Sequence, residues 1–106
     1  MISMRFDAEG IRFRVTPEEL GLLLKGQDVV QRIVTGTGSV EYSIMPVAEG
    51  DMRMAIEGMR FTLSVSRSSL EQLRDLGRSK KGIAVKQGNA DISLQVDMKT
   101  QPNRAA

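Results

Sequence analysis

The chain has 106 residues, with 15 Lys and Arg against 13 Asp and Glu, and a formal net charge of +2. It contains neither Cys nor His, which excludes disulfides, zinc–thiolate sites, thiol nucleophiles and the Ser-His-Asp triad. The weak positive charge does not indicate a nucleic-acid partner. The sequence therefore favours a protein that is not an enzyme over an enzyme, and it predicts no catalytic residue, metal site, cofactor or nucleic-acid partner.

The length and composition predict a single domain at residues 1–99. Hydrophobic residues make up 41% of the chain, which is ordinary for a globular protein. Residues 100–106 show no periodicity, and we expect a disordered tail there. The N-terminus lacks the apolar run of a signal peptide, and no apolar segment approaches membrane-spanning length. We therefore expect a cytoplasmic protein that does not enter a membrane.

The sequence resembles itself. Residues 4–13 and 52–61 are identical at six of ten positions, at an offset of 48 residues, and later matches follow at offsets of 50 and 52. Because side chains alternate with period 2 in a strand, insertions of two residues keep the apolar face of each strand inward. This pattern predicts an internal duplication, with repeat 1 at residues 3–46 and repeat 2 at residues 51–98.

Each repeat predicts a hairpin followed by a short helix. In repeat 1, Glu9 and Gly10 form the expected two-residue hairpin loop, and a capping box at residues 16–19 begins a helix that ends at Gly26. In repeat 2, Glu57 and Gly58 take the place of this loop, and a helix begins near Ser66 or Ser68 and ends at Gly77. The strands of these hairpins are expected at 4–8, 11–15, 52–56 and 59–65.

A second hairpin completes each repeat, with strands at about 29–34 and 40–44 and at about 82–87 and 92–96. Residues 29–34 carry apolar side chains on both faces, so we expect this strand to be buried on both faces. The predicted fold is α+β: two ββαββ repeats related by a pseudo-twofold axis, with a mainly antiparallel sheet that forms a sandwich or an eight-stranded barrel, and two short helices. The core is expected to bury Phe13, Phe61, Leu23 and Leu73.

Arginines recur on the outward faces of the first hairpin. A loop at Glu9 and Gly10 would place Arg5 opposite Arg14, and like charges directly across a strand pair are destabilising. Two interpretations remain open: an anion-binding site made by Arg5, Arg12 and Arg14, or a solvated surface with a carboxylate such as Glu41 between the guanidinium groups. A basic cluster at 78–81 lacks interleaved aromatic residues and is interpreted as a solvated loop.

The opening residues 4–20, with their hairpin and capped helix, and the strand at 59–65 before the second helix carry a resemblance to known proteins. The chain resembles a family of small bacterial proteins of unknown function with a duplicated hairpin-helix-hairpin unit. The resemblance covers most of residues 3–97. It implies no activity, ligand or site residue.

Two functions are therefore open. The first is a non-enzymatic binding or interaction module that presents sheet faces or edges to a protein partner or to a second copy in a homodimer. Strands 40–45 and 92–97 carry few edge defences and are the expected contact strands. The alternative is a protein that binds, or an enzyme that acts on, a small phosphate- or carboxylate-bearing ligand through the Arg-rich face.

Overall fold

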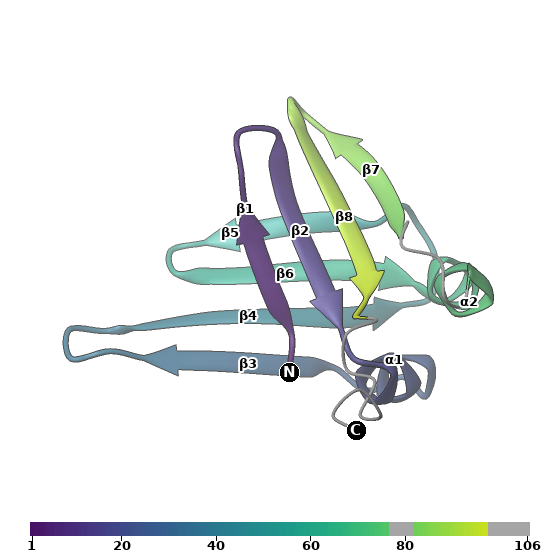
Figure 1. Cartoon of the computed structure of the whole chain (residues 1–106), viewed down its shortest axis with the longest axis horizontal. Helices are drawn as coiled ribbons and strands as arrows, with labels where there is room; N and C mark the ends of the chain where they lie inside the picture. The colour runs from purple at the N-terminus through teal and green to yellow at the C-terminus, as the bar shows by residue number, and fades with distance from the viewer. Residues whose placement is uncertain (77–81, 98–106) are drawn as a thin grey trace, which may run out of the picture.

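The computed structural model describes residues 1–76 and 82–97 (Figure 1). The predicted tail at 100–106, the predicted helix end at Gly77 and the basic cluster at 78–81 lie outside these residues. The described chain is α+β, as predicted. Its elements, in order, are β1 (Ser3–Phe6), β2 (Gly10–Val15), α1 (Pro17–Leu24), β3 (Val29–Val34), β4 (Ser39–Val47), β5 (Arg53–Glu57), β6 (Arg60–Ser66), α2 (Arg67–Leu76), β7 (Ile83–Gln87) and β8 (Ala90–Val96).

The strands of the described chain form two four-stranded sheets, and each sheet takes one hairpin from each ββαββ unit. Sheet A has the order β1-β2-β8-β7 and sheet B the order β3-β4-β6-β5. Every hairpin is antiparallel, whereas the contacts between hairpins, β2–β8 and β4–β6, are parallel. The sheets lie one over the other with crossing strands (Figure 1) and share one buried cluster. This arrangement is a sandwich of two mixed sheets.

Because each sheet combines one hairpin from each unit, β4 and β8 lie in the middle of their sheets. The prediction that strands 40–45 and 92–97 form exposed edges was therefore wrong. Alternation alone cannot separate a central strand from an edge strand when one face of the sheet is solvated in both cases. The edge strands are β1 and β7 in sheet A and β3 and β5 in sheet B.

Each helix follows directly from the second strand of its unit. In α1, Thr16 Oγ1 accepts a hydrogen bond from Glu19 N at 3.1 Å and Glu19 Oε1 accepts one from Thr16 N at 2.9 Å, which is the predicted capping box. The buried leucines of α1 are Leu20 and Leu23, and those of α2 are Leu70 and Leu73. The two helices contact each other at one corner of the sandwich (Figure 1).

The core confirms three of the four predicted buried residues: Phe13, Leu23 and Leu73 are almost completely inaccessible. Phe61 is only partly buried. The strand registers explain the difference, because Met4 lies opposite Phe13 whereas Met54 lies opposite Leu63. Leu63 is therefore the counterpart of Phe13, and Phe61 lies one row nearer its hairpin tip. The sequence match at an offset of 48 residues therefore identified the inward face of the strand correctly, but it aligned Phe13 with Phe61 and not with Leu63.

We predict that Phe13→Ala lowers the free energy of unfolding by about 3–5 kcal/mol, because it leaves a cavity in a closed core. Phe61→Ala should cost only about 1–2 kcal/mol, since water can reach the vacated space and less apolar area is lost. Urea denaturation of both variants and the unmodified chain checks this difference. Equal losses would contradict the assignment of Leu63 as the core residue of its strand.

Candidate functional site

The three predicted anion-binding residues, Arg5, Arg12 and Arg14, lie on the outer face of sheet A. The structure places Arg5 opposite Arg12, not opposite Arg14, and Arg14 lies between Ser3 of β1 and Gln95 of β8. The predicted pairing was wrong because the hairpin turns around Ala8 and Glu9, one residue earlier than expected. Two guanidinium-bearing residues still face each other across the strands.

Asp7 fixes this turn. Its Oδ1 accepts hydrogen bonds from Glu9 N at 2.8 Å and Gly10 N at 3.1 Å, and Asp7 N donates to Gly10 O at 3.0 Å. These backbone hydrogen bonds, first from Glu9 and then from Gly10, lower the pKa of Asp7, with the charges of Arg12 and Arg5 acting in the same direction. An aspartate whose side chain bonds the following amides defines a turn by itself.

Gly10 has a different role from the one expected. It has no positive φ, unlike Gly58 at φ +59° in the second unit. A Cβ atom on Gly10 would collide with the backbone of Asp91, so the absent side chain permits the close approach of β2 and β8. The glycine serves the parallel pairing of the two units and not the turn.

The ion pairs leave two of the three arginines without a carboxylate. Arg12 Nη2 lies 3.7 Å from Asp7 Oδ2, whereas no carboxylate of the described residues lies within ion-pair distance of Arg5 or Arg14. The hypothesis that Glu41 separates them was wrong. Glu41 belongs to sheet B, where its carboxylate oxygens lie 3.1 Å from Arg32 Nη2 and 3.4 Å from Arg60 Nε.

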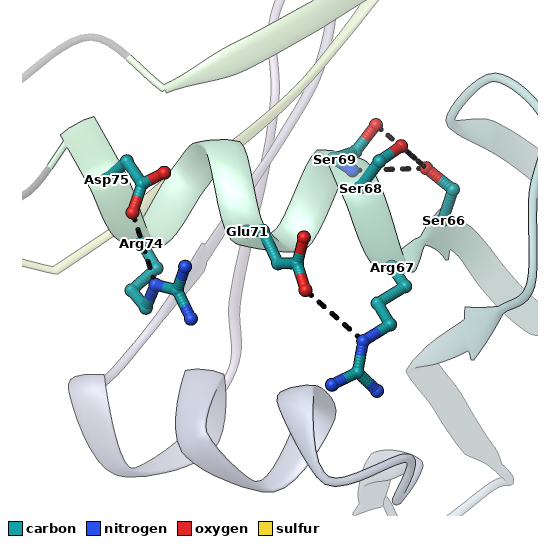
Figure 2. Close-up of polar contacts among 7 residues, drawn as sticks. All are labelled: Ser66, Arg67, Ser68, Ser69, Glu71, Arg74 and Asp75. Carbon is teal, nitrogen blue, oxygen red and sulfur yellow. Dashed lines mark hydrogen bonds and ion pairs between the residues drawn. The ribbon is translucent and has the colours of Figure 1, made fainter.

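A cluster of hydroxyls at the start of α2 is a second polar feature, and it is structural (Figure 2). Ser66 Oγ accepts a hydrogen bond from Ser69 N at 3.1 Å and lies 3.2 Å from Ser68 Oγ and 3.0 Å from Ser69 Oγ. Ser66 is therefore the N-cap of α2, the position that Thr16 occupies in α1. One turn further, Arg67 pairs with Glu71 at 3.2 Å. The hydroxyls bond one another and the helix terminus, which gives none of them an activating base.

Within residues 1–76 and 82–97, no three acidic side chains come together in a way that could hold a metal ion. None of the helices there has the length and apolarity needed to cross a membrane.

An open groove of about 680 Å³ lies between β7 and the segment 47–53, which leads from β4 into the edge strand β5. Gln87 of β7 reaches across to the backbone of β5: its Nε2 donates to Met54 O and its Oε1 accepts from Met54 N, both at 2.8 Å. A side-chain amide thus makes the pair of hydrogen bonds that a residue of a neighbouring strand would make. This clamp occupies the outward backbone groups of Met54, the second residue of β5.

The edges of sheet A are also protected. The β1 strand has only four residues, and Ile2 O, directly before it, accepts a hydrogen bond from Tyr42 Oη of the other sheet at 3.3 Å. The β7 strand is only five residues long and carries Lys86, and a short edge strand with a lysine resists pairing with another chain.

The remaining edge strand, β3, has none of these protections. Sequence analysis predicted that it is buried on both faces, and this was wrong: Val30 is 56%, Ile33 48% and Val34 74% exposed. Its single charged residue, Arg32, is paired within the same sheet with Glu41, which Arg60 also contacts. An exposed edge strand rich in β-branched apolar residues favours pairing with another strand.

The backbone of β3 is oriented for such pairing. Thr35 N donates to Gly38 O at 2.7 Å at the end of the hairpin. Hydrogen-bonded pairs alternate along an antiparallel ladder, so the odd-numbered residues of β3 bond β4. The N–H and C=O groups of Val30, Arg32 and Val34 therefore point away from β4. We call these groups, with the exposed side chains of Val30, Ile33 and Val34, the β3 edge.

Exposed apolar residues continue from the β3 edge along the inner face of sheet B, because both hairpins of this sheet run past β1 (Figure 1). The row Val29, Ile44, Leu63 and Met54 is buried. Towards the tips, the next rows contain Ile56, 57% exposed, and Met59, 61% exposed. Phe6 of β1 lies against this end, with its ring 5.6 Å from that of Phe61 in an edge-to-face contact. Sheet B thus exposes apolar side chains on the part of its inner face that sheet A does not cover.

Neither protein-family models nor curated proteins gave a match to this chain. The resemblance to a family of small bacterial proteins therefore stays a prediction.

We predict that Asp7 stabilises the fold most at neutral pH. Since its pKa is lower in the folded chain than the ordinary value of 3.8, the stabilisation is complete above that value and is lost as the pH falls below it. The stability difference between the unmodified chain and Asp7→Asn should accordingly shrink in acid, as followed by urea denaturation at several pH values. Glu9→Gln removes a charge from the same loop but none of these hydrogen bonds, and an identical pH profile for both variants would contradict the role of Asp7.

Proposed function

We propose that the protein is a non-enzymatic interaction module that binds an extended segment of a protein by strand addition to the β3 edge. The observation that carries this proposal is the combination, on one strand, of outward backbone groups at Val30, Arg32 and Val34 with exposed apolar side chains on both faces. In strand addition, backbone hydrogen bonds supply affinity and alternate side chains supply specificity.

The energetics suit a moderate, reversible interaction. Each backbone hydrogen bond to an added strand contributes about 0.5–1.5 kcal/mol net. Burial of Val30, Ile33 and Val34 adds about 25 cal/mol for each Å² of apolar surface removed from water. Because Arg32 already has its carboxylate partner in Glu41, an apolar segment can add without leaving a buried charge unpaired.

A display experiment tests the proposal with a random library of extended dodecapeptides. The unmodified chain should enrich peptides with β-branched apolar residues at alternate positions. Val34→Lys should reduce their binding at least about tenfold, because a lysine on an edge strand blocks pairing. Ala55→Lys is the matched control, since Ala55 is also exposed on an edge strand of sheet B, and it should bind as the unmodified chain does.

The outcome that contradicts strand addition at β3 is specific. It is either no enrichment at all or enriched peptides that bind Val34→Lys and the unmodified chain equally. Circular dichroism of both lysine variants establishes that the sheets are intact.

A second candidate function rests on the outer face of sheet A. The direct opposition of Arg5 and Arg12, with Arg14 next along β2, places three guanidinium groups on one face, and two of them lack an ion pair among the described residues. Guanidinium groups bind phosphate and carboxylate with good geometry. A small anionic ligand is the candidate for this face.

Phosphate distinguishes a site from a solvated surface. Arg5→Gln should stabilise the free protein by about a few tenths of a kcal/mol, because the like-charge pair with Arg12 is relieved. If the face binds anions, millimolar phosphate raises the melting temperature of the unmodified chain more than that of Arg5→Gln. The comparison is needed because phosphate also stabilises proteins non-specifically. Equal responses of the two proteins would remove this candidate.

A further inference from the structure

We propose that the segment that adds to the β3 edge is β3 of a second copy of this chain, antiparallel, with Gln31 facing Gln31 of the second copy across a twofold axis. This inference rests on the proposed function and names the partner. The result would be a closed homodimer in which two copies of sheet B form one continuous eight-stranded sheet.

The open backbone groups restrict the pairing. Those of Val30, Arg32 and Val34 point outward, so the hydrogen-bonded pairs between copies must be made by even-numbered residues. A twofold axis perpendicular to the sheet also keeps the outer face of one copy beside the outer face of the other, since residues directly opposite share a face. Even-numbered residues must therefore oppose even-numbered residues.

Three registers satisfy this rule near the middle of the strand, and charge and length separate them. A register centred on Arg32 places two guanidinium-bearing residues directly opposite each other, which is destabilising. A register centred on Ile33 shifts the pairing toward the Thr35–Gly38 loop and leaves Val29 and Val30 without strand partners. The register centred on Gln31 opposes Val30 to Arg32 and Val29 to Ile33, and it pairs the strand over residues 29–33.

In this register, residues of the second copy cover apolar side chains that are exposed in the single chain. Ile33, 48% exposed in the single chain, extends the apolar row of the inner face beside Val29 of the second copy. On the outer face, the aliphatic part of Arg32 covers Val30 of the second copy, while its guanidinium keeps Glu41 as its partner. The two Gln31 amides, which carry both donors and acceptors, come together at the axis.

The other edges explain why association would stop at two copies. The twofold contact uses the β3 edge of both chains, which makes the interface self-complementary and closed. The other described edges are less open to pairing: β1 has only four residues, Gln87 occupies the outward groups of Met54 on β5, and β7 is five residues long and carries Lys86. A dimer, and not a fibre, is the expected assembly.

Single cysteines test the register directly, because the chain has no cysteine of its own. Residue 31 and its symmetry mate would form a non-hydrogen-bonded pair with Cα atoms about 4.5 Å apart, which falls within the span of a disulfide. Gln31→Cys should form an intermolecular disulfide under mild oxidation at least about tenfold faster than Ile33→Cys. Ala84→Cys, on the β7 edge, is the control for random collision.

Sedimentation of the unmodified chain gives an independent measurement. It should show a dimer of twice 11.7 kDa at high micromolar concentration. Val30→Lys should shift it to monomer, because the new charge comes opposite Arg32 of the second copy, whereas Ala55→Lys should stay dimeric.

A monomer at that concentration, together with cross-linking of Gln31→Cys no faster than that of Ala84→Cys, would overturn the homodimer. Cross-linking of Ile33→Cys as fast as Gln31→Cys would overturn the pairing centred on Gln31. These failures are distinguishable from failure of the proposed function. If the chain is monomeric but still binds displayed peptides in a manner abolished by Val34→Lys, strand addition stands and only the identity of the partner is wrong.

Discussion

The parallel contacts β2–β8 and β4–β6 hold the two halves of this protein together. Each half contributes one hairpin to each sheet, so each half by itself has only two separate hairpins, and the four-stranded sheets exist only once these contacts form. The contact in sheet A depends on the missing side chain of Gly10, because the backbone of Asp91 occupies the place of a Cβ atom. The shared core, the crossing of the sheets and the position of both helices at one corner all follow from this exchange of hairpins.

The unequal lengths of the hairpins produce the surface on which function is proposed. The strands β3 and β4 have 6 and 9 residues, whereas β7 and β8 have 5 and 7. Sheet B therefore extends beyond the area that sheet A covers, and Ile33 of this hairpin, like Ile56 and Met59 of the neighbouring β5–β6 hairpin, is exposed although it has core periodicity. The apolar surface of sheet B is thus a geometric consequence of a sandwich whose sheets differ in length.

Much of the fold could be predicted from local patterns. Alternation and the Thr16 capping box specify strand faces and a helix start through short-range geometry, and the structure agrees with both. The loop predicted at Glu57 and Gly58 was one residue too early, because Glu57 pairs with Arg60 and the turn lies at Gly58 and Met59, with Gly58 at positive φ. The other errors concern interactions between distant segments. Apolar periodicity identifies the inward face of β3 but does not show whether a neighbouring strand covers its edge. The predicted arginine pairing was wrong because Asp7, and not Gly10, makes the turn, whereas Gly10 permits the close approach of β2 and β8. The β3 edge was missed for this reason, although its apolar residues on both faces were the available signal.

The topology also has a consequence for the order in which the protein can fold. In sheet A, Ile11 pairs with Ile92, so the first hairpin leaves the ribosome long before its neighbouring strand is synthesised. Sheet B contains contiguous hairpins, with Tyr42 next to Phe61, and can form earlier. Contacts between residues distant in sequence slow folding, and β2 must keep an apolar face and an open edge while it waits for β8. Nascent chains of this protein therefore depend on β8 to complete their structure, and a ribosome that stalls before this strand leaves β2 without its parallel neighbour and β7 without its hairpin partner.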